Sequence, residues 1–189
     1  MADHDGVRGL PARLDPDDGR IPDAFFPYMY HYGPRLILNE ADTTSTNTIH
    51  RVYFKSDVCP SSIPGDTWRK VCAISILSTF SQLSGEIQGR CYGAGVLKHE
   101  PSEASRIRLV IPQSLDVQKV NAVFQQVDTA LRENQGGKAQ RHADLFVLQP
   151  LTPQERKGII DTLGHALDEA RRRRRRAKND NNQTNARGV

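Results

Sequence analysis

The sequence predicts one small α+β domain of short strands and about three helices, with disordered or loosely attached ends. Two patterns support this fold class. Several short runs have the length or the alternation of β-strands, and longer segments carry apolar residues three and four positions apart. The 189 residues are enough for one domain with a sizeable core. We place that domain at residues 25–170, with a loosely attached segment at 1–24 and a basic, disordered tail at 171–189.

A strand, a polar loop and a second strand are predicted between residues 35 and 54. Residues 35–38 form a short apolar run after the turn Gly33-Pro34, and 49–54 alternate with strand periodicity. The loop 43–48 contains only threonine, serine and asparagine. These side chains suit phosphate oxygens and base edges, but they also form local turns. The tyrosines at 28–32 have a similar alternative, because they can belong to the core.

Helices are predicted at 68–87 and 116–134, and a third begins with a capping box at Thr152 and runs into the arginines at 171–176. Further strands are predicted at 96–98, 105–111 and 143–148. Serines at every third position from Ser75 to Ser84 form a stripe of small residues, which either lets another backbone approach closely or, in the interpretation we prefer, is a partly solvated face. The glycines near residues 85–95 either let a DNA phosphate approach the main chain or shape a tight turn.

The positive charge lies almost entirely at the C-terminal end. The net charge is +4, yet residues 171–189 carry +7 and residues 1–170 carry −3. A run of arginines binds nucleic acid without sequence preference, or it is simply a solvated tail. DNA contact by the folded part must therefore depend on local patches.

Other classes of protein have little support in the sequence. The three cysteines have no C-x-x-C spacing, so we expect free thiols, no metal site and a reducing, cytoplasmic location. No apolar run is long enough for a transmembrane helix, and the N-terminus lacks a basic-then-apolar signal. The histidine and glutamates at 99–103 do not form a metal site, because Pro101 interrupts helical spacing.

Several motifs occur in the order found in one enzyme family. PYMYHYGPRLILN, STNTIHRVYF, SQLSGEIQGR and YGAGVLKHEPSEA resemble the C-terminal region of adenine-specific DNA methyltransferases of restriction-modification systems. The resemblance covers residues 25–112. In that family this region follows the catalytic domain and is associated with target recognition, so the resemblance implies a DNA-binding module.

The chain departs from the family in its chemistry. The family's catalytic signature is Asp or Asn, two prolines and an aromatic residue, and this chain has no Pro-Pro pair. It also lacks an early glycine-rich turn between a strand and a helix. The resemblance therefore implies S-adenosylmethionine only for the full enzyme, which flips out the target adenine, and we expect no cofactor in this chain. Whether the chain is an enzyme stays open, and we do not expect activity from it alone.

We expect duplex DNA as the ligand and a separate catalytic methyltransferase chain as a possible partner, with no membrane. The resemblance assigns DNA contact to two groups of residues, Thr46, Asn47, Thr48, His50 and Arg51 in the first and Arg90, Tyr92 and Lys98 in the second. Two alternatives remain. The chain is a complete enzyme with unusual motifs, or it is a protein-interaction subunit or gene remnant without sequence-specific DNA binding of its own.

Overall fold

The computed structural model describes residues 7–10, 12–15, 20–45, 48–92 and 95–185. Its strands are short and antiparallel. A four-stranded sheet has the order β2 (Ala12–Asp15), β6 (Ile49–Phe54), β3 (Ala24–Pro27) and β5 (Ile37–Leu38). A three-stranded sheet has the order β4 (Met29–Tyr30), β8 (Val96–Lys98) and β7 (Arg90–Tyr92), and a separate pair joins β1 (Val7–Gly9) to β9 (Arg108–Val110). The mixed α+β class is confirmed.

Within residues 1–24, which we expect to be disordered or loosely attached, the described strands β1 and β2 pair with strands of the domain. Strand β1 pairs with β9 in a register that places Val7 opposite Val110. Strand β2 pairs with β6, with Leu14 opposite Val52. Leu10, between the two strands, is buried. The partners of these strands lie far along the chain, so the segment's own polar composition gave no sign of them.

The helices number more than the three that periodicity predicted. They are α1 (Gly65–Ser75), α2 (Thr79–Gln88), the single turn α3 (Pro101–Ala104), α4 (Val117–Arg132), α5 (Gly136–Val147) and α6 (Pro153–Asn185), with a 3-10 turn at Ser56–Val58. Our predicted helix 68–87 is wrong as one helix. It breaks at Ser78, whose extended backbone and side-chain hydroxyl cap α2.

The predicted strand at 143–148 is also wrong, because these residues belong to helix α5. Asp144 on this helix accepts hydrogen bonds from the Thr79 backbone N–H and hydroxyl, both at 2.7 Å. The carboxylate thus binds a free N–H group at the start of α2. Burial raises the pKa of Asp144, while these two hydrogen bonds oppose the shift.

Helix α1 forms the centre of the core. Trp68, Val71, Cys72 and Ile74 are all buried at 1% exposure or less. Helix α1 packs against α4 and α5. Our interpretation of the serine stripe as a solvated face is wrong, because Ser75, Ser78 and Ser81 are buried where the chain passes from α1 to α2.

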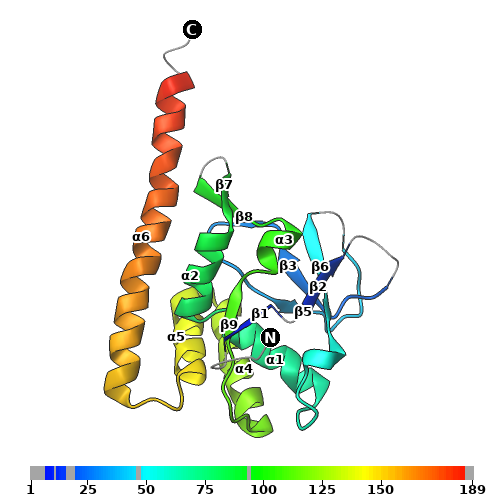
Figure 1. Ribbon diagram of the computed structural model, residues 1–189. Helices are drawn as coiled ribbons and strands as arrows, with labels where there is room; N and C mark the ends of the chain where they lie inside the picture. The colour runs from blue at the N-terminus through cyan, green and yellow to red at the C-terminus, as the bar shows by residue number, and fades with distance from the viewer. Residues whose placement is uncertain (1–6, 11, 16–19, 46–47, 93–94, 186–189) are drawn as a thin grey trace.

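Helix α6 begins at the predicted capping box. The Thr152 hydroxyl accepts from the Glu155 N–H at 3.3 Å, and the Glu155 carboxylate accepts from the Thr152 N–H at 2.8 Å. The helix stands beside α2, on the side away from the four-stranded sheet, and extends past the β7–β8 hairpin (Figure 1). Helix α6 continues through residues 171–185, which belong to the predicted basic tail.

Candidate nucleic-acid interface

The tyrosine segment belongs partly to the core and partly to the surface. Tyr30 is buried, and its hydroxyl forms a hydrogen bond with Nδ1 of the fully buried His99. Nε2 of His99 lies 2.9 Å from the Gly85 carbonyl oxygen and must therefore carry the proton. It follows that Nδ1 accepts from Tyr30. Burial is the main cause of the lowered pKa of His99 and of the raised pKa of Tyr30, so both groups are neutral at pH 7.

The glycines near residues 85–95 let protein segments pack closely together. A Cβ atom at Gly85 would lie 2.7 Å from the Pro34 ring, and one at Gly89 would lie 2.7 Å from the His99 ring. Gly95 has a φ of +71°, and its Cβ would lie 3.5 Å from the Cα atom of Arg175 on α6. Packing of α2 and α6 against their neighbours thus accounts for these three glycines, whereas Gly93 lies outside the described residues.

The first predicted group of DNA-contacting residues is divided by the structure. Thr46 and Asn47 lie outside the described residues, and Thr48 is exposed. His50 packs between Phe26 and Tyr28, and its Nε2 donates to the His99 carbonyl oxygen at 2.9 Å. Arg51 is only 6% exposed, and its guanidinium donates to the carbonyl of Ser45. The positions of His50 and Arg51 suit bracing of the loop rather than direct contact with a ligand.

The second group lies together on one face of the three-stranded sheet. Arg90 is opposite Lys98, and Tyr92 is opposite Val96. The Lys98 ammonium lies over the rings of Tyr28 and Tyr92, at 4.7 and 5.4 Å from their centroids. Hydrogen bonds to Tyr28 and Glu100 raise the pKa of Lys98. This face therefore carries a fixed cation between aromatic rings.

Acidic partners reduce the net charge of that face. The Lys98 ammonium pairs with Glu100 at 2.9 Å, and Arg90 pairs with the nearly buried carboxylate of Glu103. The Arg90 side chain nevertheless stays 70% exposed. The sheet by itself is thus close to neutral, so strong attraction for a polyanion needs charge from another element.

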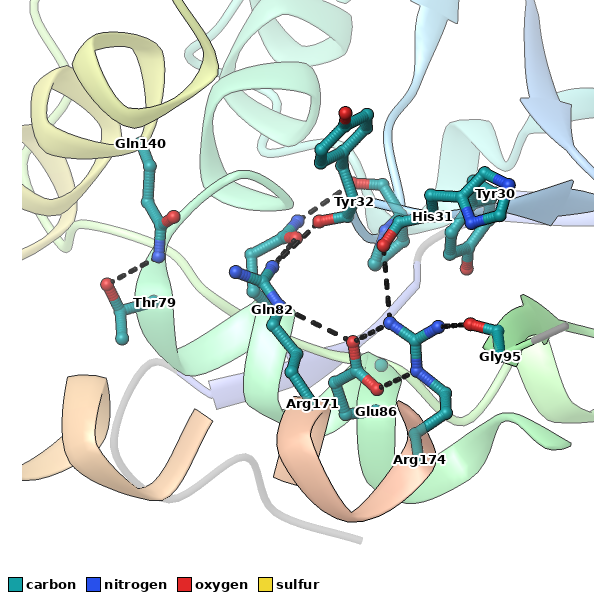
Figure 2. A network of polar contacts seen from close by, with 12 residues as sticks. Tyr30, His31, Tyr32, Thr79, Gln82, Glu86, Gly95, Gln140, Arg171 and Arg174 are labelled. Carbon is teal, nitrogen blue, oxygen red and sulfur yellow. Dashed lines mark hydrogen bonds and ion pairs between the residues drawn. The ribbon is translucent and has the colours of Figure 1, made fainter. Parts of the chain in front are cut away.

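Helix α6 supplies such charge, and two of its six arginines anchor it. Arg174 contacts the Glu86 carboxylate through Nε at 2.8 Å and Nη2 at 3.0 Å, and it also donates to the Gly95 carbonyl (Figure 2). Arg171 donates to the Tyr32 carbonyl at 2.7 Å and to the Gln82 side chain at 3.2 Å. Burial lowers the pKa of Arg171, although Glu86 opposes the shift.

Sequence reasoning missed this anchor, although the sequence holds a signal for it. Arg171 and Arg174 follow the buried Leu167 at spacings of four and seven, so they continue the apolar face of the helix. The other arginines at 172–176 are exposed. Among the side chains that the structure describes, no acidic group pairs with Arg172 or Arg175.

Helix α6 passes the β7–β8 hairpin near Arg174 and Arg175, because Arg174 donates to the Gly95 carbonyl and a Cβ added at Gly95 would lie 3.5 Å from the Arg175 Cα atom. We name four side chains of these two elements, Tyr92, Lys98, Arg172 and Arg175, the hairpin end. It combines cations with an aromatic ring, which is the chemistry that holds nucleic acid backbones and unstacked bases.

Within the described parts of the chain, no group of three His, Cys, Asp or Glu side chains is placed to hold a metal ion, and no helix is long and apolar enough to cross a membrane.

A family model matches residues 15–148, which include every strand from β3 to β9 and helices α1 to α5. Its description is type II methyltransferase M.Eco57I, C-terminal domain. The chain belongs to this family. The match confirms the resemblance to the C-terminal region of a DNA methyltransferase. Helix α6 lies beyond the matched residues, yet it docks on Glu86 of this M.Eco57I-type domain. Neither the search of curated proteins nor that of solved structures gave a match.

The described fold does not fit the S-adenosylmethionine of the family's catalytic domain. A doubly wound domain binds its ligand at the carboxyl edge of parallel strands. Every pairing between described strands is antiparallel, so the described strands form no such parallel edge. We therefore derive no step of methyl transfer from this M.Eco57I-type domain.

Proposed function

We propose that this chain binds duplex DNA at the hairpin end and serves as the target-recognition region for a separate catalytic methyltransferase chain. The family match supports a role beside a methyltransferase, whose substrate is DNA. The observation that supports the binding surface is the hydrogen bond from Arg174 to the Gly95 carbonyl, because it holds this part of α6 against the hairpin that carries Tyr92 and Lys98.

In this proposal the two elements have different tasks. Arg172 and Arg175 are exposed on a rigid helix and contact backbone phosphates, which positions the domain on the duplex. Lys98 and Arg90 exchange part of their pairing with Glu100 and Glu103 for phosphate contacts. Tyr92, which is 56% exposed, packs against sugar or base atoms.

Base reading in this proposal comes from the loop that ends at Thr48. The start of the loop is braced, because the Asn39 carboxamide donates to the carbonyls of Pro22 at 2.8 Å and Thr43 at 2.9 Å. Arg51 braces the far side through Ser45. The described residues before Thr46 are thus tied to the fold, and in this proposal Thr46, Asn47 and Thr48 contact base edges. The adenine specificity and the catalytic partner in this proposal rest on the resemblance to adenine-specific DNA methyltransferases.

The phosphate contacts are tested by the double variant Arg172→Gln/Arg175→Gln. Affinity for duplex DNA is measured by fluorescence anisotropy across a range of salt concentrations. We expect weaker binding to all duplexes and a salt slope reduced by about 2, since each lost phosphate contact lowers the slope by roughly 0.9. The matched control is Lys138→Gln/Lys157→Gln, which removes the same charge from exposed side chains of α5 and the first turn of α6. If both double variants lose the same affinity for duplex DNA, the effect is due to net charge alone, and this result would contradict DNA binding at the hairpin end.

Sequence reading is tested by selection from a random duplex pool with the full chain, at a salt concentration that suppresses non-specific binding. We expect enrichment of one short site and loss of that preference in Thr48→Ala. Binding without enrichment would leave a non-specific DNA-binding chain and contradict target recognition.

A further inference from the structure

A cavity of about 620 Å³ lies between the Tyr32–Arg35 turn, α2, the α4–α5 connection and α6. It lies within the size range of sites for small molecules, roughly 300–1,000 Å³. Its wall at the α4–α5 connection is open, because Gly136 and Gly137 carry no side chains and a Cβ at either would meet nothing within 4 Å. Asn134 in the same connection has a φ of +58°. The cavity is therefore formed where these four segments pack together.

Two guanidinium groups give this cavity a positive charge. Arg171 is held at its edge by the Tyr32 carbonyl and Gln82, as Figure 2 shows, and its buried Nε has no hydrogen-bond partner. Glu86 forms an ion pair with that Nε at 3.4 Å, but it shares its carboxylate with Arg174, which contacts it twice. Arg35 is half-buried and also lines the cavity. Arg35, Arg171 and Arg174 thus outnumber Glu86 and Asp168, the two acids that act on Arg171.

The remaining lining suits an aromatic ring with polar edges. Tyr32 is 76% exposed at the rim, where its ring is available for stacking. Leu77, Leu131 and Pro34 provide apolar wall. The carboxamides of Asn134 and Gln140 also line the cavity, and Gln140 uses its NH₂ group to donate to Thr79 at 2.8 Å. Its carbonyl oxygen is left to accept from a ligand.

We propose that this cavity binds a nucleoside monophosphate unit, with the phosphate on Arg35 and Arg171, the base against Tyr32 and its polar edge at Asn134 and Gln140. An anion alone does not need the ring and the carboxamides, and an apolar ligand does not need two guanidinium groups. The unit comes either from a free nucleotide or from an unpaired nucleotide of a nucleic acid strand. None of the four side chains of the hairpin end lines the cavity, so this proposal does not rest on duplex binding there.

The first test is calorimetric titration of the full chain with each of the four deoxynucleoside 5′-monophosphates and with inorganic phosphate. We expect at least one nucleotide to bind more tightly than phosphate. Arg35→Gln should weaken nucleotide binding by about tenfold or more, because it removes a charge-assisted hydrogen bond. Tyr32→Leu should weaken nucleotide binding and leave phosphate binding unchanged. Arg156→Gln is the matched control, since Arg156 is also half-buried but lines a different cavity between α5 and α6.

The absence of nucleotide binding by the unaltered chain would overturn the proposal. So would equal affinity for phosphate and all nucleotides, or equal weakening by Arg35→Gln and Arg156→Gln. The source of the unit is distinguished by a second titration, with a duplex that has one extrahelical nucleotide and with its fully paired counterpart. A preference for the extrahelical duplex that Arg35→Gln abolishes would assign the site to a strand, and binding of free nucleotides without that preference would assign it to free ligand.

Discussion

Arg174 on α6 and Glu86 on α2 form a two-point ion pair whose side chains are 5% and 1% exposed. It joins a helix beyond the family match to the middle of the matched domain. The Gly95 and His31 carbonyls accept from the same guanidinium, so both charges are compensated without water. A buried ion pair adds little to stability compared with apolar residues of similar volume. Removal of only one partner, however, leaves the other charge buried without compensation.

Glu86→Gln is therefore expected to destabilise the fold by about 3–5 kcal/mol, because Arg174 and Arg171 lose their shared counter-charge. Urea unfolding followed by circular dichroism measures the change. The matched control is Glu169→Gln, which breaks the exposed pair with Arg173 and should cost about 0–1 kcal/mol. If the two variants unfold alike, the buried pair does not hold α6 on α2.

Gly33→Ala should destabilise the protein by about 1–3 kcal/mol or more. Gly33 has a φ of +115°, and an added Cβ would lie 1.9 Å from the side-chain oxygen Oε1 of Gln82, which also accepts a hydrogen bond from Arg171. Gly164→Ala is the control with the opposite sign. It lies within α6 where a Cβ meets nothing within 4 Å, so it should stabilise the helix by about 1 kcal/mol. Thermal unfolding of the two variants should move in opposite directions.

Tyr30→Phe should cost about 1–3 kcal/mol, since it leaves the buried Nδ1 of His99 without a donor. Tyr28→Phe removes a hydroxyl of the same type, which donates to the half-buried Glu100 at 3.0 Å, where water can replace it. A smaller loss is expected there. Comparable losses at the two positions would argue against the neutral, Nε2-protonated form of His99.

Stability should fall as the pH drops below about 6.5, the pKa of histidine in an unfolded chain. The pKa of His99 is lowered in the fold mainly by burial and also by His50, while the Gly85 carbonyl, Glu103 and Glu86 oppose the shift. The unfolded state therefore takes up the proton first, and acid favours unfolding.

His99→Gln tests this pH dependence, because a carboxamide can both accept from Tyr30 and donate to Gly85. We expect a smaller difference in unfolding free energy between pH 7.5 and pH 5.5 in this variant than in the unaltered protein. An unchanged difference would assign the pH dependence to other groups.

Helices and strands that are determined by residues close together in the sequence could be predicted from the sequence alone. The helix start at Thr152 and the cap of α4 by Asp116, which accepts from the Lys119 N–H at 2.7 Å, depend on residues within one turn. Strand β6 has its alternation within six residues. The apolar run near Phe146 suits either a strand or a buried helix by periodicity, and contacts of Asp144 with Thr79 favour the helix.

For the candidate site, the sequence could predict which residues belong together, but it could not predict which of them are buried. Arg90, Tyr92 and Lys98 were predicted together, and they do lie on one face of a hairpin. The position of Arg51 on its strand gave no sign of its burial, which depends on neighbouring strands β2 and β3. Within the arginine run, identical residues have opposite roles because helical geometry turns Arg174 inward and Arg175 toward the surface.

By itself the sequence determined the α+β class, the family and the excess of positive charge at residues 171–176, because composition, motif order and local periodicity are properties of the chain alone. Helical spacing from Leu167 indicates that Arg171 and Arg174 face inward, but only the tertiary structure decided which groups they bind and where the exposed arginines lie. That outcome depends on Glu86, Gly95 and the Tyr32 carbonyl, which are more than seventy residues away in sequence. Desolvation of a charge is tolerated only where such partners converge, and no local pattern encodes their convergence.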